Sequence, residues 1–234
     1  MRSLEQLVTL APTGIAAPGY DYLLSRGTPA TRLDAMIPLF DLRYDEQERR
    51  VVFPVREGGV DLGYTARAID APVRKRWLSH PVEGGHKAVI YEPDGVLAGG
   101  DTLFIVEGPF DALMVTAAMQ SGNDSVATAF FGSLPTTAQL AYIIAAIPMF
   151  RMVYVMLDAN VYGRCRRLAE QLALAAAALN VGSINIGIEN RDPGATRFDE
   201  LEALVAFASA SWQSEIRWMW ERRLVFTGAG GGKE

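Results

Sequence analysis

The sequence is poor in sulfur and imidazole ligands. It contains one cysteine, Cys165, and two histidines, His80 and His86, in 234 residues. A disulfide needs a pair of cysteines, and a structural zinc site needs about four cysteine or histidine ligands. The sequence therefore excludes a disulfide framework and a cysteine/histidine zinc module. A chain with a single thiol is expected in a reducing, cytoplasmic setting.

Long hydrophobic runs are also missing. The first residues include Arg2, Glu5 and Pro12, unlike the apolar core of a signal peptide. The most apolar region, residues 141–157, is interrupted by Pro148 and Arg151 and falls short of the roughly 20 apolar residues of a membrane span. We therefore expect no targeting segment and no membrane association. A composition of 50% hydrophobic and 21% charged residues is typical of a compact globular chain.

Positive charge is scarce in the chain as a whole but concentrated in one segment. The formal net charge is −5. Between residues 49 and 87, however, eight basic residues stand against four acidic ones, so this segment carries +4 and the rest of the chain −9. Local fields steer ligands more than the total charge does. We therefore predict a basic surface on an acidic body.

The pattern of apolar residues changes near residue 98. Before it, residues 21–27 predict a helix that stops at Gly27, and residues 50–69 predict a β-hairpin. The segment "YEPDGVLAGGD" (91–101) is rich in Gly, Pro and Asp, which predicts a connector. After it, four apolar strands alternate with three helices, the first of them predicted at residues 110–122, which indicates a parallel sheet covered on both faces. The last forty residues predict a helix and a loose glycine-rich tail.

Acidic side chains follow two of these predicted strands. Glu107 comes directly after "TLFIV", Asp158 follows "MVYVML", and Asp111 lies one turn into the helix after Glu107. Open α/β sheets bind ligands beyond the carboxyl ends of their strands, and Mg²⁺ in proteins uses one or two carboxylates and bridges to phosphates. The spacing therefore favours a metal site. Alternatives stay open, because each acid alone is also typical of a turn or a helix cap, and Asp111 of an exposed helix surface.

Two motifs resemble the TOPRIM domain of bacterial-type primases, topoisomerases and some nucleases. They are "EGPFDAL" (107–113) and "LDANVYG" (157–163). Upstream, "DYLLSRG", "RVVFPVREGGVDLGYTARAI", "RKRWLSHP" and "GHKAVIYE" occur in the order and approximate spacing of the catalytic core of bacterial replicative primases. The resemblance covers about residues 20–205. It implies a smaller α+β basic subdomain at 1–98, a TOPRIM-type, mainly parallel sheet flanked by helices at 99–195, and a C-terminal helix and tail at 196–234.

The resemblance also implies roles for individual residues. Glu107 is similar to the metal-anchoring and acid/base glutamate of the family, and Asp158 to the first aspartate of its second motif. Asp192 resembles a further acidic position, with Asp199 as an additional acid, and Asp111 completes the predicted metal set. Asn160 stands where the family pattern has a second aspartate; an amide offers a metal an oxygen but no charge, so weaker metal binding is expected. The implied nucleic-acid and nucleotide contacts are Arg50, Arg67, Lys75, Arg76, Trp77 and Lys87.

The implied activity is that of a DNA primase-like nucleotidyltransferase. It would synthesise short primers on single-stranded DNA from nucleoside triphosphates, with Mg²⁺ or Mn²⁺ and without zinc. The zinc-binding and helicase-interaction modules of the family have no counterpart here, so we expect a partner such as a replicative helicase, and a phage or mobile-element origin. Two other classes stay open: a TOPRIM nuclease that activates water with the same acids, and a non-catalytic single-strand-binding protein weakened at Asn160.

The predicted contacts of the basic segment have plainer alternatives. Tyr64 and Trp77 can stack on bases, but both can instead pack in the core of the hairpin. We favour core packing more for Tyr64 than for Trp77. The "RKRW" cluster (74–77) is also typical of a solvated loop.

Overall fold

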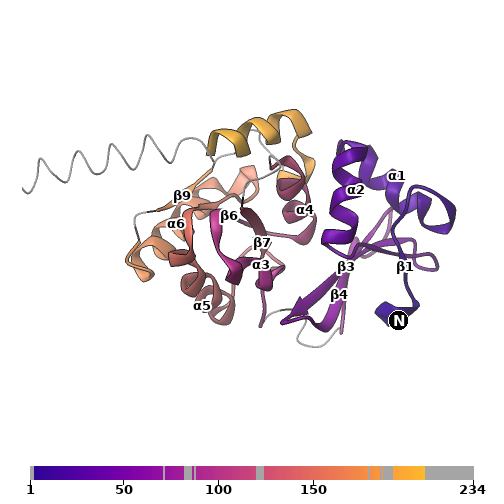
Figure 1. Cartoon of the computed structure of the whole chain (residues 1–234), viewed down its shortest axis with the longest axis horizontal. Helices are drawn as coiled ribbons and strands as arrows, with labels where there is room; N and C mark the ends of the chain where they lie inside the picture. Colours follow the sequence, from indigo (N-terminus) through magenta and orange to yellow (C-terminus); the bar gives the residue numbers. More distant parts are fainter. Residues whose placement is uncertain are drawn as a thin grey trace, which may run out of the picture.

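The computed structural model describes residues 3–70, 72–81, 86, 88–119, 124–178, 180–184, 186 and 192–208, except for the side chains of residues 93, 94 and 160. Its elements form two sheets that lie side by side, each with its own helices (Figure 1). All strand pairs of the first sheet are antiparallel, and all strand pairs of the second are parallel. This mixed α/β architecture confirms the fold class that the sequence predicts.

The first sheet has the strand order β1-β2-β3-β4-β5. Its strands are β1 (Val8–Thr9), β2 (Arg43–Asp45), β3 (Arg50–Glu57), β4 (Val60–Ala68) and β5 (Trp77–His80). The helices of this half are η1 (Leu4–Gln6), η2 (Gly14–Ala16), α1 (Ala17–Ser25) and α2 (Ala30–Leu39). Strands β3 and β4 form the predicted hairpin, and the turn between them uses Gly58 (φ 57°) and Gly59 (φ 75°), a backbone conformation that glycine adopts without strain.

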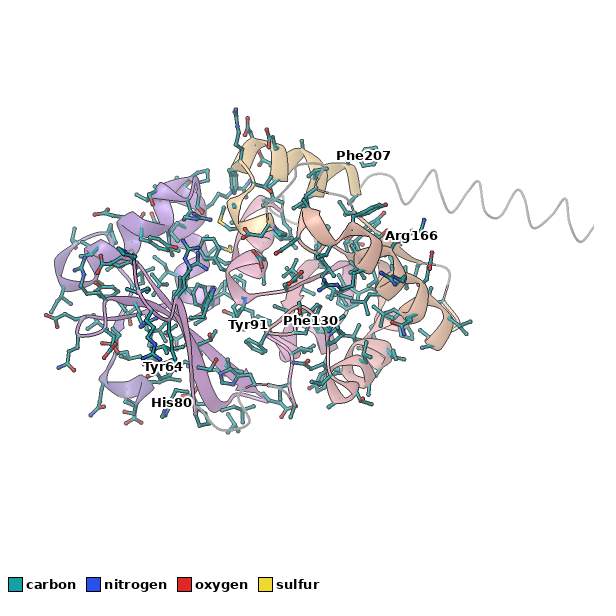
Figure 2. All side chains as sticks on the ribbon, turned by 180° about the vertical axis from the view of Figure 1, so that it is seen from behind. Tyr64, His80, Tyr91, Phe130, Arg166 and Phe207 are labelled. Atoms are coloured by element: carbon teal, nitrogen blue, oxygen red, sulfur yellow. The ribbon has the colours of Figure 1, made fainter. Side chains whose placement is uncertain are left out.

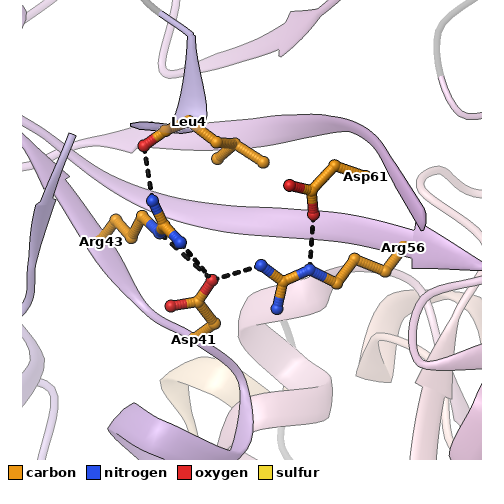
Figure 3. A network of polar contacts seen from close by, with 5 residues as sticks. All are labelled: Leu4, Asp41, Arg43, Arg56 and Asp61. Atoms are coloured by element: carbon orange, nitrogen blue, oxygen red, sulfur yellow. Dashed lines mark hydrogen bonds and ion pairs between the residues drawn. The ribbon is translucent and has the colours of Figure 1, made fainter. Parts of the chain in front are cut away.

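A polar network at the edge of this hairpin uses one of the basic residues of segment 49–87 (Figure 3). Arg56 donates to Asp61 and to the Oδ2 atom of Asp41. Arg43 donates to the same oxygen at 2.8 Å and to the carbonyl of Leu4 at 2.6 Å. The two guanidinium groups lower the pKa of Asp41, although burial opposes them. Arg56 therefore serves the fold, and nearby carboxylates offset its charge.

The second sheet has the strand order β7-β6-β8-β9. Its strands are β6 (Gly100–Val106), β7 (Ser125–Ala129), β8 (Phe150–Val155) and β9 (Val181–Ser183). Its helices are α3 (Pro93–Ala98), α4 (Pro109–Ala118), α5 (Thr137–Ala146), η3 (Ile147–Met149), η4 (Ala159–Val161), α6 (Tyr162–Ala175) and η5 (Pro193–Ala195). Residues 198–208 are helical and form the gold helix in Figure 1.

Helices cover both faces of the parallel sheet, as its continuous apolar strands predict. Successive side chains of a strand point to opposite faces. Leu103 and Ile105 of β6 pack in the cluster that contains the buried side of α5 and α6, whereas Phe104 and Val106 pack with α4. Both faces of the parallel sheet are therefore buried under helices, which explains why its strands do not alternate between apolar and polar residues.

One hydrophobic core joins the two sheets. The cluster around Phe104 and α4 continues into the antiparallel sheet through Phe53 of β3. The rings of Phe53 and Phe110 meet edge to face, with their centroids 6.4 Å apart. This shared core fixes the edge of the parallel sheet against β3, β4 and β5. The two sheets fall on either side of residue 98, and the domain limits at 98 and 195 stay predictions.

Two local predictions are corrected by the structure. The connector predicted at residues 91–101 contains the short helix α3, which starts at Pro93, a good first residue of a helix, and ends at Gly99 with a φ of 74°. The helix predicted at 110–122 ends at Ala118. The part of the predicted C-terminal helix after residue 208 and the predicted glycine-rich tail lie outside the described residues. In the described part of the chain, no helix has the length and hydrophobicity that crossing a bilayer requires.

Candidate active site

A pocket of about 330 Å³ lies where the carboxyl ends of the parallel strands face β4 and β5. Four carboxyl groups line it, and they belong to Glu107, Asp111, Asp158 and Asp192. Arg26, Arg67 and Trp77 line it as well. The pocket therefore brings acids of the parallel half together with basic and aromatic residues of the antiparallel half.

Glu107 lies at the end of β6, where the strand turns into α4. Its carbonyl accepts a hydrogen bond from the N–H of Gly132, which follows β7, at 3.1 Å. Burial raises the pKa of the Glu107 carboxyl to about 7, and the charge of Asp158 adds to this rise. The N–H of Asp158 and the charge of Arg164 act in the opposite direction. Since Gly108 occupies the N-cap position of α4, Glu107 is free of the capping role that the sequence left open.

Asp158 follows β8 and precedes the short helix η4. Its pKa is raised by burial and then by the charge of Asp192, while Arg164 lowers it. The N-cap residue of α6 is Val161, so Asp158 does not cap that helix. Asp158 is instead the N-cap residue of η4, but its side chain makes no capping hydrogen bond there, and the residue lines the pocket.

Asp111 ties the start of α4 to the segment that carries Asp192. Its Oδ2 accepts from the N–H of Gly108 at 3.1 Å, and its Oδ1 accepts from the N–H of Gly194 at 3.0 Å. The residue is only 8% exposed, so it is not the surface helix residue that the sequence allowed. Burial raises the pKa of its carboxyl, and Asp192 adds to the effect. Each oxygen keeps a further lone pair that can accept another contact.

The donor set fits a divalent cation. Hard cations take oxygen ligands, and all four carboxyls of the pocket offer them. The Oδ1 atom of Asp192 is buried and has no hydrogen-bond partner among the described residues, and Glu107, Asp111 and Asp158 experience one another or Asp192 as repelling charges. Among the described residues, no three acidic, histidine or cysteine side chains form a complete ion cage.

The opposite wall of the pocket is built from alternating cationic and aromatic groups. The guanidinium of Arg67 lies 5.1 Å from the ring centroid of Trp77 and 5.9 Å from that of Phe110. The guanidinium of Arg26 also lies over the ring of Phe110, 5.5 Å from its centroid. Arg67 also donates to the hydroxyl of Tyr22 at 3.2 Å. These contacts hold two positive charges at the pocket. Among the described ion pairs, neither Arg26 nor Arg67 forms a salt bridge with an acid of the pocket.

Comparisons with known proteins identify the architecture. No protein-family model and no curated protein sequence matches the chain. A DnaG primase catalytic domain bound to single-stranded DNA matches it with a TM-score of 0.61 and 17% identity, over 86% of this chain and 74% of that chain. The chain has the fold of a DnaG primase catalytic core. The resemblance seen in the sequence is thereby confirmed at the level of the fold.

Other structures of the same kind agree. The RNA polymerase domain of the Mycobacterium tuberculosis primase DnaG, in complex with a double-stranded DNA oligomer with a 6-nucleotide overhang, matches with a TM-score of 0.60 and 18% identity, over 85% of this chain and 74% of that chain. The E. coli primase catalytic core matches with a TM-score of 0.57 and 18% identity, over 87% of this chain and 77% of that chain.

Not every predicted site residue comes to the pocket. Arg50 is buried and donates to the carbonyls of Lys75 and Arg76 at 3.0 and 3.3 Å, so it holds the chain before β5. Lys75 and Arg76 are exposed, and neither is among the described residues that line the pocket. Asp199 is exposed and forms an ion pair with Arg197 at 2.7 Å. Of the predicted contacts, Arg67 and Trp77 do lie at the pocket.

Three further predictions have distinct outcomes. Lys87 lies outside the described residues, and so does the side chain of Asn160, whose backbone belongs to η4. Tyr64 is 2% exposed and packs against Leu4, Leu7 and neighbouring side chains, which confirms the core packing favoured for it.

Sequence reasoning missed Arg26. This residue caps α1 and reaches across to the carbonyl of Gly194, to which it donates at 3.2 Å. Its Nε is buried without a hydrogen-bond partner among the described residues. The signal was present, because Arg26 belongs to the "DYLLSRG" motif on which the resemblance to primases partly rests.

Proposed function

We propose that the chain is a DNA primase-like nucleotidyltransferase that synthesises short primers on single-stranded DNA. One observation carries the proposal: a single pocket sets four carboxyls against Arg26, Arg67 and Trp77. Phosphoryl transfer needs cationic groups for the phosphates and anchored metal ions for the developing charge. The likeness in fold to primase cores, one of them bound to single-stranded DNA, supports the same activity.

In this proposal, Glu107, Asp158 and Asp192 hold Mg²⁺ or Mn²⁺, and Asp111 positions the Asp192 segment. When bound, such an ion stabilises the charge on the attacking and leaving oxygens. The raised pKa of Glu107, about 7, leaves its carboxyl partly protonated at neutral pH in the metal-free protein. Metal binding must displace that proton, so affinity for the ion is expected to increase with pH.

The cationic wall of the pocket, formed by Arg26, Arg67 and Trp77, holds the nucleic-acid and nucleotide phosphates. Arg67 and Arg26 are spaced by aromatic rings that keep their guanidinium planes in place. Trp77 offers a flat surface to a base, and each such stacking contact is worth about 1–3 kcal/mol. A partner such as a replicative helicase, and a phage or mobile-element origin, remain predictions.

The two alternative classes explain less of the pocket. A nuclease of the TOPRIM type needs the acids but does not need the primase-like hairpin of β3 and β4 that carries Arg67. A binding protein without catalysis needs the wall but has no use for carboxyls that raise one another's pKa.

The decisive experiment is primer synthesis on single-stranded DNA with labelled nucleotides and Mg²⁺ or Mn²⁺. We expect products with the wild type and none with Glu107→Ala. Glu170→Ala is the matched control, since Glu170 is exposed on α6 and pairs with Arg166, at 3.5 Å, in a surface contact of small energy. Template degradation that depends on Glu107 would instead indicate a nuclease, and binding without either activity would indicate a single-strand-binding protein.

A further inference from the structure

The side chain of Gln139 is fully buried, and its amide contacts the backbone next to the pocket residues Phe131 and Gly132. Gln139 lies in the first turn of α5, and its exposed fraction is 0%. Its Nε2 lies 2.8 Å from the carbonyl oxygen of Val89, 3.0 Å from that of Phe130 and 3.2 Å from that of His86. An amide has two hydrogens to donate, so the three carbonyls share them. One side chain thus joins the end of β7 to the segment before α3.

The other end of the same amide belongs to the helix cap. Its Oε1 accepts from the N–H of Thr136 at 2.9 Å and from the hydroxyl of Thr136 at 3.2 Å. The two ends of the side chain therefore have separable tasks. The oxygen completes the start of α5, and the nitrogen fixes backbone that belongs to other elements.

The backbone held by this nitrogen has an uncommon conformation. Phe131, next to Phe130, has a φ of 58°, in the left-handed region that residues with a β-carbon seldom adopt. Such a conformation persists only where its surroundings determine it. The ring of Phe131 packs against His86, with centroids 5.0 Å apart, and edge to face against Tyr91 at 6.1 Å. Figure 2 shows Tyr91 and Phe130 near the centre of the molecule, with Tyr64 and His80 to one side.

The left-handed turn leads directly to the pocket. Phe131 and Gly132 both line it, and the N–H of Gly132 donates to the carbonyl of Glu107 at 3.1 Å. On the other side, His86 Nε2 lies 3.0 Å from the carbonyl of Tyr64, which precedes the pocket residue Thr65 in β4. Gln139 holds the backbone of His86 and Phe130. Through these segments it is linked to the end of β6, the end of β7 and strand β4 of the other sheet.

We propose that Gln139 is a positioning residue for the active site, which sets the backbone of Glu107 by holding the Phe130–Gly132 turn. The inference rests on the proposed function, and it concerns a residue that contacts neither nucleotide nor metal. Groups that hydrogen-bond a metal ligand typically change affinity or activity by about 10–100-fold when mutated, and Gln139 acts on Glu107 one step further away, through the Phe130–Gly132 turn. Displacement of a reacting group by about 1 Å can cost about 100-fold in rate.

The test separates the nitrogen of Gln139 from its oxygen. Gln139→Met removes both the donor and the acceptor at a similar chain length, whereas Gln139→Glu removes the amide donor but keeps an oxygen toward Thr136. Thr136→Ala is the control, because it weakens the cap of α5 and leaves the Nε2 contacts intact. Each variant is compared with the wild type in thermal melting, Mn²⁺ affinity by electron paramagnetic resonance, single-stranded DNA affinity, and the kcat and KM of primer synthesis.

We expect both Gln139 variants to lose about 10-fold or more in Mn²⁺ affinity and up to about 100-fold in kcat, with little change in DNA affinity. Thr136→Ala should lower the melting temperature and leave Mn²⁺ affinity and kcat near those of the wild type. Unchanged Mn²⁺ affinity in the Gln139 variants would overturn the proposal. So would equal losses in Thr136→Ala, or a lack of cooperative melting in both Gln139 variants, since Gln139 would then serve the fold alone.

The readouts also distinguish this inference from the proposed function. A wild type that makes no primers but binds Mn²⁺ would reject primer synthesis, and the Mn²⁺ affinities of the variants would still decide the role of Gln139. A wild type that binds no Mn²⁺ would overturn both.

Discussion

The N–H of Gly194 donates to the Oδ1 atom of Asp111 at 3.0 Å, across 83 residues of sequence. This bond brings the segment that begins at Asp192 back to the edge of the parallel sheet. A β-carbon at position 194 would lie 2.4 Å from Cδ1 of Phe110 and 2.8 Å from Oδ1 of Asp111. Glycine is therefore required here by close approach, and the acid at 192 depends on it.

Gly194→Ala should consequently destabilise the protein and weaken metal binding. Forcing a methyl group into a packed site costs about 1–3 kcal/mol, and here the displaced segment carries a proposed metal ligand. Chemical denaturation and Mn²⁺ titration would measure the two effects. Gly163→Ala is the matched control, since no described atom lies within 4 Å of its added β-carbon and alanine favours the helix α6. Equal losses in both variants would contradict this account of Gly194.

The metal-free protein should lose stability as the pH rises from about 5 to about 8. The pKa of Glu107 is raised from its ordinary 4.5 to about 7, so the folded state binds this proton more tightly than the unfolded chain does. Stability from such a group is fully present below the ordinary pKa and disappears as the pH passes the raised one. Thermal melts in a chelator would show the slope, and added Mg²⁺ should restore stability at the higher pH.

Glu107→Gln should flatten that slope, because an amide does not titrate. Asp199→Asn provides the contrast: Arg197 lowers the pKa of the exposed Asp199, so its contribution is lost only as the pH falls through the acid range. A steep slope that survives Glu107→Gln would mean that Asp111 or Asp158, whose pKa values are also raised, dominates the pH dependence.

Arg67→Ala should weaken binding of single-stranded DNA and reduce its dependence on salt. Arg67 is held at the pocket by the ring of Trp77 and the hydroxyl of Tyr22, and removal of one phosphate contact lowers the salt slope by about one. Fluorescence anisotropy at several salt concentrations would measure both. Arg49→Ala is the control, because Arg49 is exposed and paired with Asp70 at 2.6 Å. An unchanged affinity in Arg67→Ala would remove the main support for a primase.

The sequence predicted the parallel sheet and the two acids at its edge because these depend on local pattern. Each apolar strand is continuous, and Glu107 and Asp158 are the first polar residues after two of them. The position of a strand end is a local property, and the side-by-side arrangement of strands follows from the strand–helix alternation.

The remaining site residues depend on contacts that no local pattern encodes. Arg26 meets Gly194 across 168 residues, and Gln139 meets His86 across 53. The family resemblance implies that Arg50 contacts nucleic acid, yet this residue is buried and donates to backbone carbonyls. Whether an arginine serves the fold or a ligand depends on which carbonyls and aromatic rings surround it, and the tertiary structure determines those.

Asn160→Asp should strengthen metal binding and raise the rate of primer synthesis. Position 160 belongs to η4, the short helix that begins directly after Asp158. An added carboxylate at this position brings a charge that the amide lacks. The extra acid should also increase the repulsion on Asp158 in the metal-free protein, so stability without metal should fall while stability with Mn²⁺ rises. Melting temperatures with chelator and with Mn²⁺, together with primer synthesis, would test both directions. If activity does not change and DNA binding needs no metal, the pocket serves binding alone, and the carboxyls of Glu107 and Asp158 have some task other than catalysis.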